Sequence, residues 1–384
     1  MPVIVLSAFN VANFPEGGGH FWVYMQYVLG LRQCGCEVYW LERFVSTDDP
    51  TRDEAAIATF FRRTAEFGLG DRVILLVGPD PKRSPGAALH YRGLDASQAE
   101  GVFRRADLLL NFHYAIDPEL LARFRRTALV DIDPGLLQFW ISRGQLVVPC
   151  HDVYFTTGET VGTKAARFPD CGLTWVDIHP PVALGRWPLS PAAPAAAMTT
   201  ISAWDGGDWI VDGDQMYENT KRMSFLRYKD LPRLTPQPLE LALFLRTAMD
   251  EQDRQLMERH GWTIRRSREI AATPERYQAY IQGSLGEFSC AKPSCMKFQN
   301  AWVSDRTVCY LASGKPVVVQ DTGPSHYLPN GEGMFRFSTL EQAAEALAAV
   351  SADYPRHCRA ARALAETHFD ASRVAKRILE NGLG

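Results

Sequence analysis

The sequence predicts an α/β protein made of two doubly wound domains. Along both halves of the chain, short apolar runs alternate with helical patterns, as expected for parallel strands joined by helical crossovers. A proline-rich stretch separates these two series of elements. The length of 384 residues also exceeds that of one ordinary core and suits two domains of about 150–200 residues each.

The first half of the chain begins with an apolar strand at Val3–Phe9. This strand leads through a glycine-rich turn to a helical pattern over residues 21–33. Because helical patterns also separate the later strands, we expect the strands to run parallel with right-handed crossovers. The later strands are predicted at Glu37–Leu41, Val73–Val77, Ala106–Phe112 and Ala128–Ile132.

A change of composition marks the boundary between the two domains. Residues 179–197 contain five prolines, and proline both fixes φ and removes a backbone donor. Such a stretch is typical of an extended connection. The sequence therefore predicts an N-terminal domain over residues 1–180, a linker over 181–197 and a second domain over 198–368.

The second half of the chain repeats the alternation of strands and helices. Strands are predicted at Met198–Trp204, Leu239–Leu245 and Val317–Gln320. An amphipathic helix is predicted at Ser338–Val350, where alanine and leucine fill the interior positions. Two further helices, at about Tyr354–Phe369 and Ala371–Glu380, complete the chain.

Composition narrows the class of protein. The formal net charge of −3 provides no overall attraction to nucleic acid. No apolar run reaches the about 18–20 residues that a membrane-spanning helix needs. The N-terminus lacks the basic start and cleavage pattern of a signal peptide, so a cytoplasmic protein is expected. The eight cysteines form no Cys-x-x-Cys pair, so we expect neither bound metal nor disulfides.

The segment from Trp302 to Gly323 carries the clearest functional signal. A helix is predicted to end at Gly314, because glycine suits the left-handed position after a helix and the following Lys-Pro pair cannot continue it. Three consecutive valines then indicate a parallel strand that is covered on both faces. Ligands of open α/β sheets lie where such strands end, so the next side chains are expected in a site. These side chains are Gln320, Asp321 and Thr322.

A run of glycines precedes the first predicted helix. Gly17, Gly18 and Gly19 allow a ligand to approach the backbone and the first amides of the helix, and His20 follows them. The run matches neither the dinucleotide fingerprint nor a P-loop, since no further spaced glycine and no Lys-Ser/Thr pair follows. His20 is a candidate proton acceptor. The alternative is a flexible turn whose histidine only caps the helix.

Polar residues also follow other strands of the first half. Asp131 and Asp133 occupy alternate positions and point to opposite faces, so Asp133, nearer the turn, is the candidate for a site. An Asx turn before proline is the alternative for Asp133. His113 ends the preceding strand, where it either lines a site or packs in the core. Glu159 lies in a glycine-containing loop that suits either ligand contact or ordinary surface.

The second half contains basic residues suited to an anionic ligand. Arg306 and Ser304 stand at the start of a predicted helix over Thr307–Ser313, where backbone amides favour anions. Lysine and arginine can stabilise a departing diphosphate where no metal does so. The alternatives are solvated lysines and an Arg306 that only pairs with Asp305. Replacing Arg306 by alanine is expected to reduce turnover and leave folding intact. The basic residues are Lys221, Lys292, Lys297 and Arg306.

Segments of both halves match one known group of enzymes. They are Asp131–Gly135, Pro180–Val182, Tyr277–Ile281, Gly286–Lys292, Trp302–Gly323, His326–Phe337 and Ala363–Ala371. Together they resemble a bacterial group of GT-B glycosyltransferases, similar to glycosyltransferase families 1 and 4, whose members are largely uncharacterised. The resemblance implies two Rossmann-like domains facing a cleft and an activated sugar on the second domain. It also implies a last helix, residues 369–384, that crosses back to the first domain.

The resemblance and the basic residues together predict a metal-independent glycosyltransferase without a cofactor. It would move a sugar from a UDP-, GDP- or TDP-sugar to a small-molecule or glycan acceptor, and nucleic acid is not expected as a partner. His20 or Asp133 would assist deprotonation of the acceptor. The diphosphate would be held by Lys292, Lys297, Ser304 and Arg306, and the sugar by Glu287, Gln320, Asp321, Thr322 and Gly323. The acceptor side would include Gly18, Gly19, His113 and Glu159.

One departure from the resembled group leaves the stereochemistry open. Many retaining GT-B enzymes carry two glutamates eight positions apart around the donor helix, and the matching positions here are Ala301 and Cys309. Asp321 and Glu287 are the candidates to replace them. Two other functions share the pattern: a sugar-nucleotide 2-epimerase that needs no acceptor, and a cytosolic sugar- or nucleotide-binding protein without catalysis. The sugar, the base, the acceptor and the oligomeric state stay open.

Overall fold

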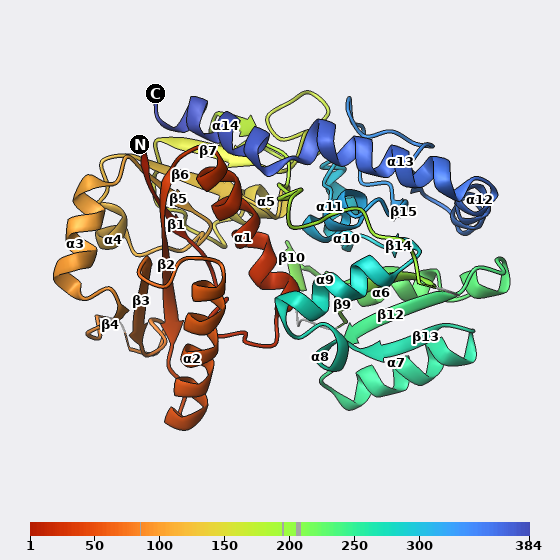
Figure 1. Cartoon of the computed structure of the whole chain (residues 1–384), viewed down its shortest axis with the longest axis horizontal. Coiled ribbons are helices and arrows are strands. Elements are labelled where there is room, and N and C mark those ends of the chain that lie inside the picture. Colours follow the sequence, from red (N-terminus) through yellow and green to blue (C-terminus); the bar gives the residue numbers. More distant parts are fainter. Residues whose placement is uncertain (85, 194–195, 205–208) are drawn as a thin grey trace.

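Two parallel β-sheets, one from each half of the chain, form the frame of the protein (Figure 1). This computed structural model describes residues 1–84, 86–193, 196–204 and 209–384. We call the first sheet with its helices the N lobe and the second sheet with its helices the C lobe. Among the described residues, no helix combines the length and the apolar character that crossing a membrane requires.

The sheet of the N lobe has eight strands in the order β4-β3-β2-β1-β5-β6-β7-β8. All neighbouring pairs run parallel except β3 and β4. The order reverses between β1 and β5, which is the switch point of a doubly wound sheet. The strands are β1 Val3–Ser7, β2 Glu37–Val45, β3 Val73–Gly78, β4 His90–Gly93, β5 Leu108–Asn111, β6 Thr127–Asp131, β7 Val153–Thr156 and β8 Trp175–Asp177.

Helices of different lengths connect the strands of the N lobe. Three of them begin at aspartate caps: Asp49 accepts a hydrogen bond from the Arg52 amide, Asp95 forms a reciprocal capping box with Gln98, and Asp117 caps α4. The helices are α1 Gly18–Gln33, α2 Pro50–Glu66, α3 Ala96–Arg105, α4 Pro118–Leu121 and α5 Leu136–Ser142.

The sheet of the C lobe has six parallel strands in the order β13-β12-β9-β14-β15-β16. Its switch point lies between β9 and β14. A separate antiparallel hairpin, β10 Trp209–Asp212 with β11 Gln215–Glu218, stands beside it. The sheet strands are β9 Met198–Ala203, β12 Leu239–Phe244, β13 Thr263–Arg266, β14 Gly286–Ser289, β15 Val317–Gln320 and β16 Met334–Phe337.

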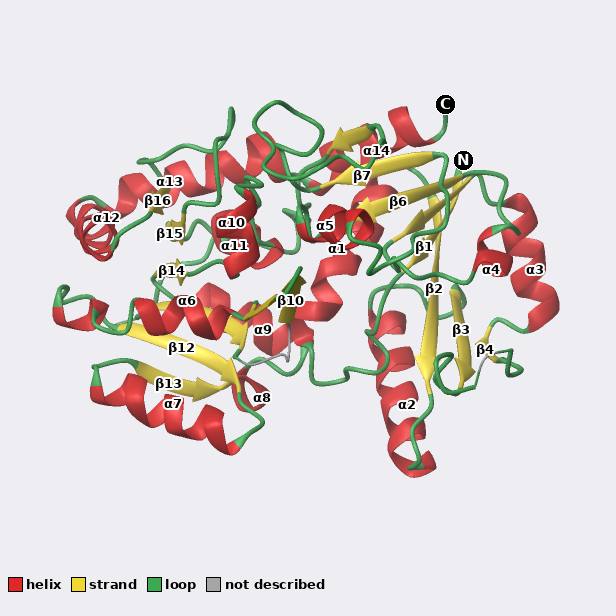
Figure 2. Cartoon of the chain, turned by 180° about the vertical axis from the view of Figure 1, so that it is seen from behind, coloured by secondary structure: helices red, strands yellow, loops and turns green. Residues whose placement is uncertain are grey.

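The helices of the C lobe lie on both faces of its sheet (Figure 2). They include α6 Lys221–Arg227, α7 Ala248–Arg259, α8 Ser267–Ile270, α9 Pro274–Gly283, α10 Pro293–Phe298, α11 Asp305–Ala312, α12 Leu340–Ala352 and α13 Tyr354–Leu364. A 3-10 turn at Leu231–Arg233 and a π turn at Ala365–Phe369 complete this part, and α14 Ala371–Gly382 ends the chain.

The predicted fold class of two doubly wound α/β units is confirmed. The strand predicted at Val317–Gln320 is observed with the same bounds, as β15. The predicted helix after Trp302 begins at Asp305, two residues earlier than expected, because Ser304 caps it. Strand β14 was missed, since it carries Glu287 and Ser289 at fully buried positions that read as polar in the sequence.

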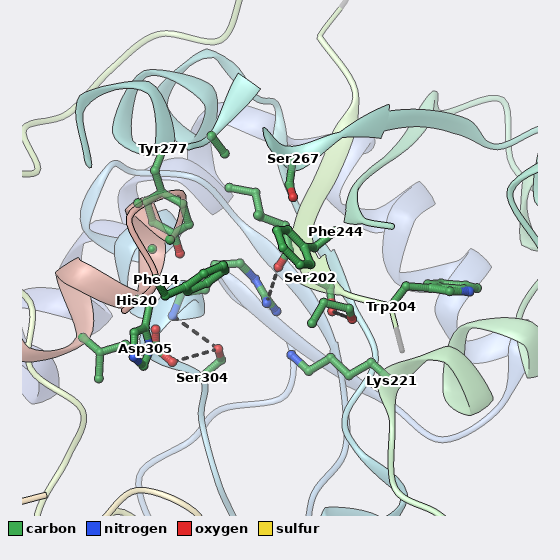
Figure 3. A pocket seen from close by; sticks show the side chains of 18 of the residues that line it. Phe14, His20, Ser202, Trp204, Lys221, Phe244, Ser267, Tyr277, Ser304 and Asp305 are labelled. Atoms are coloured by element: carbon green, nitrogen blue, oxygen red, sulfur yellow. Dashed lines mark hydrogen bonds between the residues drawn. The ribbon is translucent and has the colours of Figure 1, made fainter. Parts of the chain in front are cut away.

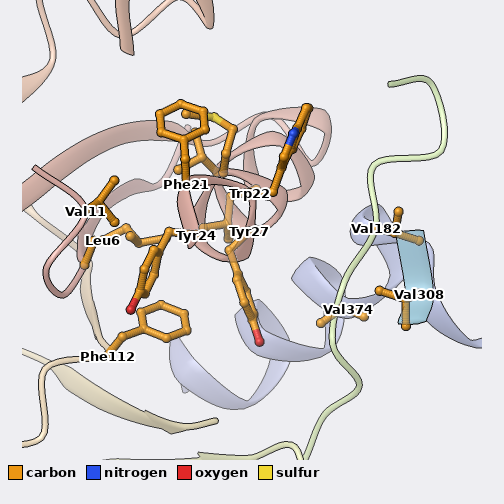
Figure 4. Packing of buried hydrophobic residues seen from close by; sticks show 14 of the residues in the cluster. Leu6, Val11, Phe21, Trp22, Tyr24, Tyr27, Phe112, Val182, Val308 and Val374 are labelled. Atoms are coloured by element: carbon orange, nitrogen blue, oxygen red, sulfur yellow. The ribbon is translucent and has the colours of Figure 1, made fainter. Parts of the chain in front are cut away.

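Helix α1 lies between the lobes and is buried around most of its circumference. Phe21, Trp22, Tyr24 and Tyr27 all pack in the main core, and Figure 4 shows them around one helix. The Trp22 indole donates to the carbonyl of Pro274 in the C lobe at 3.0 Å. A helix that is apolar on nearly all sides is one that both lobes can enclose.

The chain crosses from one lobe to the other twice, and the two crossing segments lie side by side. The amide of Val182 donates to Phe369 at 2.7 Å, and the amide of Ala371 donates back to Val182 at 3.0 Å. Helix α14 then packs on α1 and β7 of the N lobe, as the predicted crossing requires. The boundaries at residues 180, 197 and 368 stay predictions, and residues 194–195 of the predicted linker lie outside the described residues.

Candidate functional site

A cavity of about 450 Å³ lies between the two lobes, and we call it the interlobe cavity (Figure 3). The N lobe contributes the turn after β1 and the first turn of α1. The C lobe contributes the residues that follow β9, β12 and β14 and the starts of α6 and α11. Since β9 and β14 flank the switch point of the sheet, this is where an α/β sheet of this order binds ligands. The lining side chains include Phe14, His20, Ser202, Trp204, Lys221, Phe244, Tyr277, Lys292, Trp302, Ser304, Asp305 and Arg306.

The glycines at the start of α1 allow the two lobes to approach each other closely. A Cβ atom on Gly18 would stand 2.4 Å from the carbonyl oxygen of Thr273, and one on Gly19 would stand 2.5 Å from the ring of Tyr277. Both contacts are far shorter than van der Waals distance. The glycine run was predicted to allow a ligand to approach the backbone. The structure shows Gly18 and Gly19 on the cavity wall, and the protein itself already requires them to be glycine.

His20 lines the interlobe cavity from the first turn of α1. Its Nε2 donates to the carbonyl of Phe9 at 2.8 Å, so the neutral ring has its lone pair on Nδ1. Burial lowers the pKa of His20 below its ordinary value of 6.5, and this effect outweighs the hydrogen bond to Phe9 and the charge of Asp305. The imidazole is therefore neutral at pH 7 and able to accept a proton.

Arg306 forms the floor of the interlobe cavity and is held on three sides. Its Nε donates to the Glu287 carboxylate at 2.7 Å, while its two terminal nitrogens donate to the carbonyl of Ile201 at 2.7 Å and to the hydroxyl of Ser289 at 2.6 Å. Burial alone would lower the pKa of Arg306, but the Glu287 charge raises it above its ordinary value. The guanidinium is thus a fixed positive charge beneath the cavity.

Two lysines add to this positive charge. Lys221, the first residue of α6, extends its amino group toward the middle of the cavity, while His20 and Asp305 lie on the opposite side (Figure 3). Burial, together with the charge of Arg306, lowers the pKa of Lys221 to about 7. Its Nζ lies 5.6 Å from the centre of the Trp302 ring, within cation–π range. Lys292, after β14, also lines the cavity.

The N-terminus of α11 faces the same cavity. The Ser304 hydroxyl caps the helix by accepting a hydrogen bond from the Arg306 amide at 3.2 Å. Asp305 occupies the first helical position, where its negative charge suits the helix dipole. Of the residues predicted to hold a diphosphate, Ser304, Arg306 and Lys292 are therefore brought together.

The fourth of these residues, Lys297, lies elsewhere. Its amino group donates to Asp212 at 2.7 Å and to the hydroxyl of Tyr217 at 3.1 Å, on the surface beside the β10–β11 hairpin. Its side chain is 43% exposed. Because α10 directs Lys297 toward the hairpin, its position does not support the predicted contact with a diphosphate.

The residues predicted to bind the sugar lie in three places: beneath the interlobe cavity, in a small recess beside it, and in the loop beyond this recess. Glu287 is fully buried and its Oε1 accepts from Arg306, so it lies beneath the interlobe cavity and not on its wall. Gln320 and Thr322 line a small recess of about 20 Å³ that shares Trp302 and Ser304 with the interlobe cavity. There Gln320 accepts from the Ala291 amide at 3.0 Å, and the Thr322 hydroxyl donates to Trp302 at 2.8 Å.

Asp321 and Gly323 lie in the loop just beyond this recess. The Asp321 carboxylate pairs with Arg336 and accepts a hydrogen bond from the Gly323 amide at 3.0 Å. Gly323 has φ of 135° and lies against the backbone of Gln299, which explains why glycine occupies this position. Neither residue lines the interlobe cavity as the structure describes it.

The predicted acceptor-side residues Glu159 and His113 are also placed apart. Glu159 accepts from the amide of His326 at 2.7 Å and from its ring at 2.8 Å, which joins the two lobes at another point. His113 lines other cavities in the N lobe and stacks on Phe9, with ring centres 4.9 Å apart. Burial, with Arg43 nearby, lowers the pKa of His113 to about 4.

Asp133 connects the interlobe cavity with a neighbouring cavity of the N lobe. Its carboxylate lies 3.9 Å from the amino group of Lys292, and its own side chain lines the neighbouring cavity. Asp131, two residues earlier, is fully buried and accepts hydrogen bonds from Gln138 and Thr156. The sequence-based choice between these two aspartates therefore placed Asp133 on the open side.

Some residues of the cavity were not among those predicted to hold the donor or the acceptor. Phe244 ends β12, so the strand-end rule that pointed to Gln320 would have pointed to it as well. Lys221 follows Thr220, a residue type that often begins helices, and was recognised only as a basic residue. No cluster of three or more His, Cys, Asp or Glu suited to a metal occurs among the described residues.

Comparison with known proteins extends this description. The sequence matches no protein-family model and no curated protein. The structure matches an α-glucosyltransferase solved in complex with UDP over 99% of both chains, with 12% identity and a TM-score of 0.62. It also matches sucrose-phosphate synthase from Thermosynechococcus elongatus over 99% of this chain and 98% of that chain, with 11% identity and a TM-score of 0.54.

A third similar structure is HepE of Anabaena, solved with UDP and glucose. It matches over 99% of both chains, with 11% identity and a TM-score of 0.54. At such identities the likeness concerns the fold. Together with the two doubly wound sheets and the returning helix α14, it shows that the chain has the GT-B fold, as the sequence predicted.

Proposed function

We propose that this protein is a glycosyltransferase that moves a sugar from a nucleotide-diphosphate sugar to the hydroxyl of an acceptor. The observation that carries the proposal is the gathering of Arg306, Lys221 and Lys292 around one cavity between two GT-B lobes. The neutral walls beside these cations include Trp302 and Tyr277, whose faces suit a base or a sugar ring. The similar structures that were solved with UDP support the choice of donor class.

The net reaction assigns a task to each group of residues. The bond between the anomeric carbon and the diphosphate oxygen breaks, and the nucleoside diphosphate leaves with the electron pair. The acceptor oxygen forms a new bond to the anomeric carbon and loses its proton. Lys221, Lys292 and the α11 amides would neutralise the leaving group, so the proposal requires no metal for this task.

His20 is the proposed recipient of the acceptor proton. It lines the cavity on the side opposite Lys221, and its neutral ring offers Nδ1 as an acceptor. Asp133 is the second group able to serve, through its place beside Lys292. Proton transfer to a positioned base of this kind contributes about 100-fold to 10,000-fold to the rate of many enzymes.

A binding experiment with a matched pair of variants tests the proposal. Calorimetric titration with UDP-, GDP- and TDP-glucose should show binding of one donor, and Lys221→Met should weaken that binding by about tenfold or more. Lys297→Met makes the same substitution outside the cavity and should leave the affinity unchanged. No binding of any of these donors, or equal losses in the two variants, would overturn the proposal.

Product analysis separates transfer from the other functions compatible with this fold. After incubation with the bound donor and a mixture of hydroxylated acceptors, mass spectrometry should detect a glycosylated product and free nucleoside diphosphate. Formation of an epimeric sugar nucleotide without an acceptor would identify an epimerase instead. Donor binding without any product would identify a binding protein.

A further inference from the structure

A second cavity, of about 520 Å³, lies in the N lobe beside the interlobe cavity, and we call it the N-lobe cavity. It opens where β1, β5 and β6 end, and β1 and β5 flank the switch point of the N-lobe sheet. That position is the general place for a ligand in a doubly wound sheet. Its wall is mainly apolar and includes Phe9, Phe112, Tyr114, Ile132, Trp140 and Leu146.

The polar groups of this wall are mostly occupied by the protein itself. The Tyr114 hydroxyl accepts hydrogen bonds from the amides of Ile132 at 3.0 Å and Asp133 at 3.1 Å. The Tyr24 hydroxyl donates to the carbonyl of Phe9 at 3.2 Å, and the side-chain amide of Gln145 donates to the carbonyl of Val211 at 2.8 Å. What these residues offer to a ligand is therefore chiefly their carbon faces.

Phe9 is an exposed aromatic ring at the border of the cavity. Its side chain is 49% exposed, although most aromatic rings of this protein are buried, and it stacks on His113 with an angle of 27° between the rings. Both rings of the stacked pair line the N-lobe cavity. Aromatic surfaces of this kind bind other rings and apolar groups.

Two contacts connect the N-lobe cavity with the proposed site of transfer. Asp133, whose side chain is 40% exposed, lies 3.9 Å from Lys292 of the interlobe cavity. His20 and Tyr24 stand one turn apart on α1, His20 at the interlobe cavity and Tyr24 at the N-lobe cavity, and both donate to the Phe9 carbonyl. A ligand in the N-lobe cavity would thus contact Asp133 directly, and its end would have to extend toward the interlobe cavity to approach His20.

We infer that the acceptor is an apolar, ring-bearing small molecule with one hydroxyl group, rather than a glycan. This inference rests on the proposed function and specifies its acceptor. A glycan would bring many hydroxyls to a wall that offers few free partners, and burying unpaired polar groups is costly. A phenol or aromatic alcohol matches the wall with its ring and needs a polar partner only at the reacting oxygen.

The transfer step then balances with the residues already described. The acceptor oxygen forms a bond to the anomeric carbon, and its proton passes to His20 or Asp133. The anomeric bond to the diphosphate breaks, and the electron pair leaves with the nucleoside diphosphate toward Lys221 and Lys292. No oxidant or further reactant is needed.

Direct binding of 2-naphthol to the whole protein tests the inference without depending on turnover. Calorimetric titration should show saturable binding of 2-naphthol at one site and no measurable binding of maltose. Phe9→Ala should weaken the 2-naphthol affinity by about tenfold. This substitution keeps the backbone carbonyl that His20 and Tyr24 use. Leu234→Ala, which removes a side chain of similar exposure from the C lobe, should change nothing.

A measurement of sugar transfer to 2-naphthol completes the test. It also separates the inference about the acceptor from the proposed function. With the donor that binds, the protein should glycosylate 2-naphthol, and Phe9→Ala should lower kcat/KM for it while the donor Kd stays the same. Three results would overturn the inference. They are a failure of the protein to bind 2-naphthol, an unchanged 2-naphthol affinity in Phe9→Ala, and transfer to maltose in preference to 2-naphthol. Intact 2-naphthol binding without binding of any donor would overturn the proposed function and leave the aromatic site in place.

Discussion

The guanidinium of Arg306 donates to the carboxylate of Glu287 at 2.7 Å, and the two side chains are only 7% and 0% exposed. The pair joins the start of α11 to strand β14 directly beneath the interlobe cavity. A buried pair of this kind leaves an uncompensated charge when one partner is removed, because neither side chain can reach water. Arg306 therefore has a structural task in addition to any effect of its charge on a ligand.

This pair changes what we expect from Arg306→Ala. The sequence alone suggested a loss of turnover with intact folding. With Glu287 left buried and unpaired, we now expect the free energy of unfolding to fall by about 3–5 kcal/mol. Urea unfolding followed by circular dichroism measures this loss.

A double variant provides the control for Arg306. Arg306→Met combined with Glu287→Leu removes both charges and fills a similar volume, so it should recover most of the stability lost in Arg306→Ala. If Arg306→Ala unfolds at the wild-type urea concentration yet loses turnover, the arginine acts on the substrate alone.

The lowered pKa of Lys221 predicts a pH dependence of donor binding. Burial and the Arg306 charge lower this pKa to about 7, so the empty cavity loses the Lys221 charge as the pH rises through 7. A bound diphosphate restores the charge by stabilising the protonated amine. The Kd for the donor should therefore increase by about tenfold between pH 6 and pH 8.

Lys221→Arg isolates this effect, because arginine stays charged across the whole range. A UDP-sugar is a suitable probe, since its diphosphate has no terminal phosphate group that titrates near pH 6. Titration calorimetry at pH 6, 7 and 8 should show a flat profile for the variant. A profile as steep as that of the wild type would assign the titration to another group.

Gly30→Ala should disrupt the packing of α14 on α1. A Cβ atom at position 30 would stand 2.3 Å from the carbonyl oxygen of Ala371, and backbone cannot move aside as a flexible side chain can. Overpacking of this kind typically costs about 1–3 kcal/mol. A lower thermal midpoint and earlier proteolysis near residue 371 are the expected observations.

Gly101→Ala is the matched control for this prediction. Gly101 lies in α3, and a Cβ atom there would meet nothing within 4 Å. Alanine has the higher helix propensity, so this variant should gain up to about 1 kcal/mol of stability. Equal effects of the two substitutions would show that the α1–α14 contact does not limit stability.

The raised pKa of Asp131 predicts that the stability of the protein depends on pH. Burial raises its pKa from 3.8 to about 7, although Gln138 and Thr156 donate to it. Between about pH 4 and pH 7 the folded state binds the proton that the unfolded state has released, so the contribution of Asp131 to stability is lost as the pH rises. The difference in pKa corresponds to about 4 kcal/mol at most.

Asp131→Asn removes this titration while keeping the shape of the side chain and one acceptor oxygen, which can face the donors Gln138 and Thr156. The free energy of unfolding, measured in urea at pH 5, 6 and 7, should fall less steeply with pH in the variant than in the wild type. Glu42, whose pKa is also raised to about 7 by burial, keeps its own contribution in both proteins. Identical slopes would mean that Asp131 is charged in the folded state throughout this range.

Local sequence patterns were sufficient for much of the fold. The run Val317–Gln320 became β15 with the predicted bounds, because three valines in a row favour a strand that is covered on both faces. Ser304 and Gly314 bracket α11 as capping residues do, since each satisfies or ends the helix through its own backbone neighbours. Strand β14 escaped prediction because Glu287 and Ser289 are polar residue types, and the partner that they meet in the interior, Arg306, lies 17 to 19 residues further along the chain.

The sequence by itself determined the alternation of strands and helices, the two-unit α/β class and the presence of basic residues suited to a diphosphate, because these depend on side-chain type and local spacing. Tertiary structure alone decided which of those residues meet. It brought Lys221 and Lys292 to one cavity, directed Lys297 toward Asp212 on the surface and enclosed Arg306 with Glu287. These outcomes depend on contacts between residues far apart in the chain, and such contacts form only when the two sheets and the helix between them pack together.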